Sequence, residues 1–74
     1  MIFTRKDIKN KRDSHIVVPE GYEIIDDRCF YGFHTLSRIT LPSTLKHLND
    51  ECFSHCDRLT KIIIPINVLV IVLH

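Results

Sequence analysis

The sequence of 74 residues lacks most features that mark an enzyme. It contains only 2 glycines, and no Gly-rich phosphate loop, nucleophile elbow or His-Glu-x-x-His stretch occurs in it. The adjacent carboxylates Asp26 and Asp27 are better explained as helix-capping residues than as an acid–base pair. We therefore expect a protein that has no catalytic residues and no cofactor.

Signals for a membrane span or a secretory route are also missing. The apolar run from residue 62 to residue 73 is interrupted by Pro65 and Asn67, and a spanning helix needs about 20 residues. No apolar stretch follows the charged residues at the start, so no secretory signal is visible. These absences favour a cytoplasmic location, with surface association by an unconventional route left open.

What the sequence does have is an internal repeat. Residues 19–41 align with residues 42–64 without a gap, and 6 of the 23 positions are identical. A proline opens each copy, and another follows the second copy one period later. A fixed period in this range is typical of stacked coils, in which each unit contacts only its neighbours. We predict that equivalent side chains, such as Phe30 and Phe53, stack over one another in a shared core.

Each copy predicts two short strands and one helical turn. Residues 37–41 and 60–64 are rich in β-branched and apolar residues and end before a proline, as expected for short parallel strands. Residues 16–18 fit the same strand one coil earlier. A second apolar piece follows each proline, and an aspartate then begins a helical turn that carries a Cys-Phe pair.

The order of residues in one copy is similar to the BspA-like leucine-rich repeat. The clearest stretch runs from Leu36 to Pro65, and the resemblance covers about residues 14–71. The resemblance implies an α/β solenoid, in which a right-handed leucine-rich-repeat coil carries a short parallel β-sheet and short helical turns. It also implies an adhesion or protein-interaction module from a family of usually longer arrays, found in bacterial surface proteins and parasitic protists and not known as enzymes.

The two ends of the chain fit the repeat only in part. We expect residues 1–13 to form a basic, poorly ordered leader, because they lie outside the pattern. Solenoids usually need about three repeats, so the chain is either a truncated copy of a longer array or a protein that associates end to end with itself. The expected repeat segment is 14–74, with full copies at 19–41 and 42–64 and partial copies at 14–18 and 65–74.

Apolar positions that recur in both copies predict the core. They alternate with polar positions that differ between the copies, which we attribute to a drifting surface. The predicted core residues are Tyr22, Ile25, Cys29, Phe30, Leu36, Ile39 and Leu41 in the first copy, and Leu45, Leu48, Cys52, Phe53, Leu59, Ile62 and Ile64 in the second.

Basic residues between the inward positions of the strand predict a surface for a partner. Arg38 and Lys61 are one period apart, with His15 one coil earlier, and Thr40 and Ile63 flank them. Repeat proteins commonly bind partners on this extended face. Arg38, Thr40, Lys61 and Ile63 are therefore the candidate binding face, and a solubilising stripe is the alternative interpretation.

The cysteines and histidines suggest a metal site at first sight. Cys52, His55 and Cys56 have thiol and imidazole groups, which are the ligands that zinc prefers. Both thiols coincide with apolar positions of the other copy, and that copy has no matching set, so we expect no metal site. The count of 3 cysteines is odd and favours reduced thiols, although stacking would bring Cys29 and Cys52 within disulfide range.

We interpret the chain as a non-catalytic leucine-rich-repeat module for protein–protein interaction, a short or truncated member of a larger adhesion-type family. Its partner would be another protein of unknown identity. The alternative is a small nucleic-acid-associated protein that uses a basic tail. A net charge of only +1 disfavours nucleic acid. The tail contains Arg5, Lys6, Lys9, Lys11 and Arg12, diluted by Asp7 and Asp13.

Overall fold

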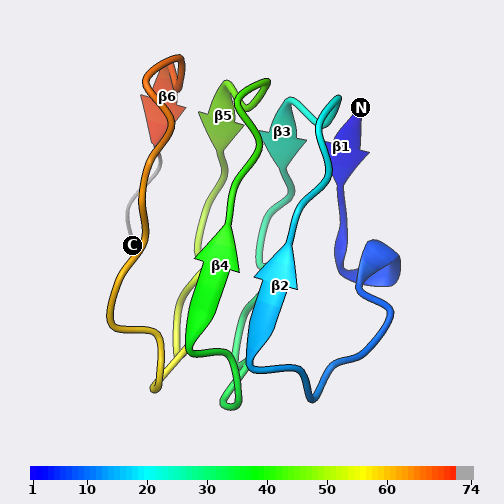
Figure 1. Cartoon of the computed structure of the whole chain (residues 1–74), viewed down its shortest axis with the longest axis vertical. Coiled ribbons are helices and arrows are strands. Elements are labelled where there is room, and N and C mark those ends of the chain that lie inside the picture. The colour runs from blue at the N-terminus through cyan, green and yellow to red at the C-terminus, as the bar shows by residue number, and fades with distance from the viewer. Residues whose placement is uncertain (72–74) are drawn as a thin grey trace.

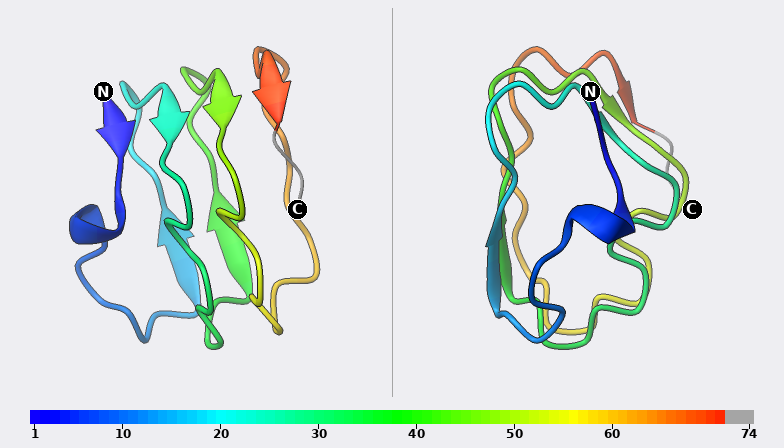
Figure 2. Two further views of the ribbon diagram at one scale, coloured as in Figure 1. Left: turned by 180° about the vertical axis from the view of Figure 1, so that it is seen from behind. Right: turned by 90° about the vertical axis from the view of Figure 1, so that its right-hand side faces the viewer.

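The computed structural model describes residues 1–71. Over these residues the chain winds through coils that lie side by side in sequence order (Figure 1). Viewed along the stack, the coils follow similar outlines (Figure 2). We define coil 1 as residues 1–18, coil 2 as 19–41 and coil 3 as 42–64. Residues 65–71 begin the next turn, and the rest of the expected partial copy, 72–74, lies outside the described residues.

Two parallel sheets run along the stack. Equivalent residues of neighbouring coils pair directly, as Ile16 does with Ile39 and Ile25 with Leu48. These pairs are one period apart, so the predicted stacking of equivalent positions is confirmed. One sheet has the strand order β1 (Ile2–Phe3), β3 (Ile24–Ile25), β5 (His47–Leu48), β6 (Val70–Ile71), and the other contains β2 (His15–Val17) and β4 (Arg38–Thr40).

The core lies inside the coils and contains a column of three phenylalanine rings. Phe30 is fully buried, and its ring stacks on that of Phe53 with centroids 5.4 Å apart and planes 3° from parallel. On the other side Phe3 stacks on Phe30 at 5.9 Å. Aromatic pairs of this kind contribute about 0.5–1.5 kcal/mol beyond the burial of their area. The column therefore links coils 1, 2 and 3.

Coil 1 differs from the sequence-based expectation. Residues 1–13 are not a separate leader, because β1 pairs with β3, and Phe3 and Ile8 belong to the buried core. A short 3-10 helix, η1 (Arg5–Asp7), follows β1, and the Asp7 carboxylate accepts hydrogen bonds from the Thr4 backbone and hydroxyl. Ile2 pairs with Ile24, a spacing of 22 residues rather than 23, so a gapless comparison misses this coil.

The helical turns expected at the Cys-Phe pairs are not helices. No α-helix occurs in the described part of the chain. The residue before each Cys-Phe pair, Arg28 or Glu51, has a φ of 53°, which lies in the left-handed region and prevents a right-handed helix from starting. The backbone bonds to the next coil instead. The N–H groups of Arg28, Phe30 and Gly32 donate to the carbonyl oxygens of Asp50, Cys52 and Ser54 at 2.8–2.9 Å.

The strand expected over residues 60–64 is reduced to one bridge. Ile39 pairs with Ile62, and no other residue of this segment forms a β-pair among the described residues. In the view along the stack, the segment runs inside the outline of the two preceding coils (Figure 2). Ile64 is consequently 39% exposed and is not the core residue that the repeat predicts.

The other predicted core positions lie in or against the core cluster. The second copy is less buried than the first, both at Phe53 and Leu59 and in the segment 60–64 that departs from the sheet. Buried are Ile25, Cys29, Phe30, Leu36, Ile39, Leu45, Leu48 and Cys52, and partly buried against them are Tyr22, Leu41, Phe53, Leu59 and Ile62.

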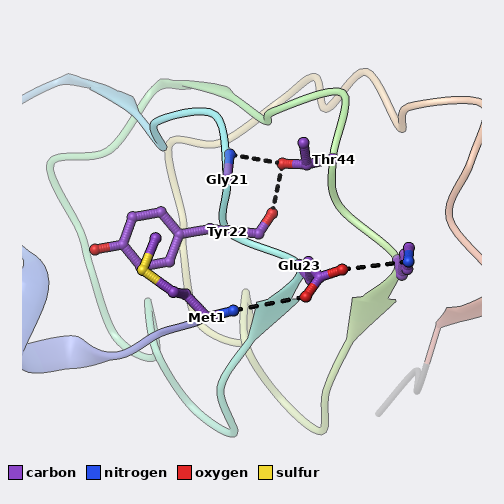
Figure 3. Close-up of polar contacts among 6 residues, drawn as sticks. Met1, Gly21, Tyr22, Glu23 and Thr44 are labelled. Carbon is purple, nitrogen blue, oxygen red and sulfur yellow. Dashed lines mark hydrogen bonds and ion pairs between the residues drawn. The ribbon is translucent and has the colours of Figure 1, made fainter.

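The polar positions that differ between the copies are paired across the coils. Glu23 illustrates the arrangement, because its carboxylate lies between the Met1 amino group at 3.6 Å and the Lys46 Nζ at 3.2 Å (Figure 3). The differences that we attributed to drift are therefore complementary contacts between neighbouring coils. Further pairs, each one period apart, are Arg28 with Glu51 at 3.0 Å, His34 with Asp57 at 2.8 Å, and Glu20 with the Ser43 backbone N–H at 2.8 Å.

Candidate partner-binding face

The four residues predicted as a binding face line one groove on the molecule. Arg38 and Thr40 come from β4, and Lys61 and Ile63 come from the segment that follows it one coil later. The groove has a volume of about 700 Å³, and residues 65–67 also line it. The structure therefore brings these side chains around a common space.

The groove exists because coil 3 does not continue the sheet of β2 and β4. Beyond the single bridge at Ile62, residues 60–64 leave the position that a third strand would occupy. The side chains on the outer side of this segment are left uncovered. Ile63 is 72% exposed and Ile66 is 97% exposed, so the groove has apolar walls open to solvent.

His15 holds two of the groove side chains in place. Its Nδ1 lies 3.3 Å from the Arg38 guanidinium, and its Nε2 lies 2.9 Å from the Thr40 hydroxyl. Because a guanidinium can only donate, Nδ1 is the acceptor in the contact with Arg38, and Nε2 faces the Thr40 hydroxyl. The imidazole thus orients Arg38 and Thr40 on one face of β4.

The charges around the groove have one sign. Arg38 and Lys61 are the only charged residues among the described residues that line it. The Glu20 carboxylate accepts hydrogen bonds from the backbone N–H and hydroxyl of Ser43, which lines the groove, but Glu20 itself does not line it. The groove can therefore attract negative charge beside an apolar surface.

The family follows from comparison with known proteins. A family model described as "BspA type Leucine rich repeat region (6 copies)" matches residues 5–72. The chain belongs to this family. A search of curated proteins and a search of solved structures gave no match. The match starts at Arg5 and so includes much of coil 1, in agreement with the burial of Ile8 in the shared core.

Sequence reasoning missed part of the groove of this leucine-rich repeat. Ser43, Ile66 and Asn67 also line it. A signal was present, because Ile66 replaces the polar residues Glu20 and Ser43 at its repeat position. The turn itself is retained, because the Val68 N–H donates to the Pro65 carbonyl at 3.2 Å as the Leu45 N–H does to Pro42 at 3.1 Å, so the signal is an apolar side chain at an exposed turn position.

The cysteines of the repeat lie in the core as packing groups. Cys29 is 0% and Cys52 is 5% exposed, and both are free thiols. Burial raises the pKa of Cys29 to about 12 and that of Cys52 to about 11, and Cys52 and Asp26 add to the effect on Cys29. Cys56 donates to the Phe30 carbonyl at 3.0 Å, and burial raises its pKa as well. Over residues 1–71 no group of three potential ligands could hold a metal ion.

The basic residues near the start are not equivalent. The Arg5 guanidinium donates to the carbonyl oxygens of Tyr31 at 2.9 Å and Cys29 at 3.4 Å, so it ties coil 1 to coil 2. Lys6, Lys9 and the remaining cations of this segment are exposed. No helix in the described residues is long and apolar enough to cross a membrane.

Proposed function

We propose that this leucine-rich-repeat chain is a non-catalytic module that binds another protein through the groove beside β4. The binding residues would be Arg38, Thr40, Lys61 and Ile63. We also propose that its coils have the right-handed sense of a leucine-rich-repeat solenoid, since connections between parallel strands of one sheet are right-handed in about 98% of cases.

One observation carries the proposal of a binding face. Four residues chosen from the sequence for their outward positions line a single groove with apolar walls and two cations. Exposed apolar surface rimmed by polar residues is typical of interaction sites. Membership of a repeat family supports the same function, because repeat proteins use extended faces for partners.

A charge-reversal experiment tests the proposal. Binders would be selected from a displayed library of protein fragments against the folded chain. The double variant Arg38→Glu with Lys61→Glu should weaken most of them at least about tenfold, which corresponds to about 1.4 kcal/mol. The control variant is Lys11→Glu with Arg58→Glu, which changes the net charge equally at two exposed positions outside the groove.

The two variants separate a specific surface from a general effect of charge. Binders that respond equally to both variants, or to neither, would contradict the proposed face. Circular dichroism of each variant shows whether the fold is retained, which we expect because all four substituted side chains are exposed.

End-to-end self-association is a second proposal, supported by a different surface. Leu69 is 75%, Val70 is 44% and Ile71 is 43% exposed at the last described coil. A second copy could cover these side chains by stacking on them. Sedimentation velocity at increasing concentration should then show dimers, and Leu69→Glu should abolish them. A monomer at all concentrations would end this proposal.

A further inference from the structure

We propose that the groove beside β4 receives an extended acidic peptide segment of the partner. Its carboxylates would face Arg38 and Lys61, and an apolar side chain between them would pack against Ile63 and Ile66. This inference rests on the proposed function and goes further, because it names the chemistry of the partner.

The shape of the groove fits a short extended chain. One wall is β4, and the other is formed by residues 60–67. An extended chain rises about 3.3 Å per residue, so the strand wall matches a segment of about three to five residues. A volume of about 700 Å³ is within the range of sites that enclose ligands of this size.

The charges of the groove are available to a ligand. Neither Arg38 nor Lys61 has an ion-pair partner among the described residues, whereas Arg28 and Lys46 are already paired with glutamates. Two unpaired cations that line one groove repel one another, and two carboxylates of a ligand would offset that repulsion.

Arg38 is also partly ordered before any ligand binds. Its contact with His15 at 3.3 Å limits the rotamers of a long side chain, and ordering such a side chain is a cost of binding. The Thr40 hydroxyl is fixed by the same ring at 2.9 Å and lies beside Arg38 on the strand. A carboxylate placed over β4 would meet a guanidinium that already points to this face.

The apolar walls favour a peptide over a nucleic acid. Affinity for a phosphate backbone grows with the number of cations that contact it, and the groove offers only Arg38 and Lys61 among its described lining residues. Ile63 and Ile66 contribute nothing to phosphate, but they can bury an apolar side chain. An acidic peptide with an apolar residue between its carboxylates uses both features.

The test is a titration of the isotope-labelled chain, followed by backbone amide shifts in nuclear magnetic resonance. The probe is acetyl-Glu-Leu-Glu-Val-Glu-amide, and the matched control is acetyl-Gln-Leu-Gln-Val-Gln-amide. We expect the acidic peptide to shift the amides of Ile39, Ile63 and Ile66, and the control to bind about five- to tenfold more weakly. The variant Arg38→Gln with Lys61→Gln should remove this preference, whereas Lys11→Gln with Arg58→Gln should keep it.

Each other outcome overturns the inference in a distinct way. Equal binding of both peptides, or shifts confined to another face, would remove the acidic segment as occupant. Stronger binding of a five-nucleotide oligothymidylate in the same groove would assign it to nucleic acid. If the same amides shift when only the protein concentration is raised, the groove would be assigned to a second copy of the chain. If library binders lose affinity for the charge-reversal variant but are not acidic, the proposed function stands and this inference fails alone.

Discussion

The rings of Phe30 and Phe53 lie one above the other, 3° from parallel, although one is fully buried and the other only partly. Phe30 lies between two other rings, because Phe3 stacks on its opposite face. Phe53 has a phenylalanine neighbour on one side only within the described residues. The two residues occupy the same repeat position, but Phe30 is more deeply buried and stacks on two rings, whereas Phe53 stacks on one.

This asymmetry predicts the order of two substitutions. Phe30→Ala should lower the free energy of unfolding by about 3–5 kcal/mol, a large part of the roughly 4–11 kcal/mol available to a domain of this size. Phe53→Ala should cost less, because part of its ring is already in contact with water. Urea unfolding measures both values. Phe30→Leu and Phe53→Leu give the same comparison if the alanine variants do not fold, and an equal or larger loss at Phe53 would contradict the column.

Substitution of Gly32 should destabilise the fold through backbone conformation alone, without a steric clash. Its φ is +68°, and a Cβ added there would meet no atom within 4 Å. Gly32→Ala should therefore cost about 1 kcal/mol from the left-handed conformation alone. Gly32→Asn should cost less, because asparagine tolerates this region. Thermal unfolding against Thr60→Ala, a control at an exposed position, would test the order, and equal costs for alanine and asparagine would contradict it.

Glu23 predicts a loss of stability in acid. The hydrogen bond and charge of Lys46, together with the Met1 amino group, lower the pKa of Glu23 below 4.5. A group whose pKa is depressed by folding stabilises the folded state above its unfolded pKa, and the effect is lost as the pH falls through the folded value. The melting temperature should therefore fall below about pH 4.5 more steeply for the native chain than for Glu23→Gln.

A charge exchange checks the assignment of this acid effect. Glu23→Lys should destabilise the chain at neutral pH, because it places like charges beside Lys46 and the Met1 amino group. Adding Lys46→Glu should restore one contact but not the other, so the double variant should be intermediate. Identical acid profiles of the native chain and Glu23→Gln would show that Glu23 is not coupled to folding.

The buried thiols predict a loss of stability in alkali. Folding raises the pKa of Cys29 from 9.0 to about 12 and that of Cys52 to about 11, because burial disfavours the thiolate. The folded chain then holds more protons than the unfolded chain between these values, so the free energy of unfolding falls as the pH rises above about 9. Denaturant titrations from pH 8 to pH 11 should show a shallower loss in Cys29→Ala with Cys52→Ala than in the native chain.

Thiol reactivity provides an independent measurement of the same burial. Iodoacetamide should modify the denatured chain rapidly and the folded chain slowly, since the thiolate is the reactive form and is disfavoured in the core. Rapid modification of Cys29 or Cys52 in the folded chain at neutral pH would contradict their placement.

The strongly periodic features were predictable from the sequence. The stacking of coils 2 and 3, the phenylalanine pair and most core positions follow from residues that recur after 23 places. They were predictable because an inward position is restricted to similar apolar side chains in every coil that shares the core. The outward positions of the four candidate binding residues were predictable from the same alternation of inward and outward residues. The groove that they line was not predictable in this way.

Other features depend on interactions that one sequence does not display. Coil 1 has a 22-residue offset, and Phe3, which pairs with Ile25, stacks on Phe30 in the column, while Ile8 joins the buried core. The left-handed backbone at Arg28 and Glu51 involves residues that usually avoid it, so a helical turn was the natural expectation. The groove arises because residues 60–64 leave the sheet after a single bridge at Ile62. Their β-branched and apolar composition favours a continued strand, so the sequence does not predict this departure.

The unlike pairs between coils limit how this array can change. A duplicated coil 2 would place Glu23 against Glu23, Arg28 against Arg28 and His34 against His34, whereas coil 3 presents Lys46, Glu51 and Asp57 at these places. The polar side chains of coil 2 therefore complement those of coil 3 but would not complement a second copy of coil 2. Lengthening the protein by exact duplication would be penalised at every new junction, so any viable extension must diverge in sequence as it grows.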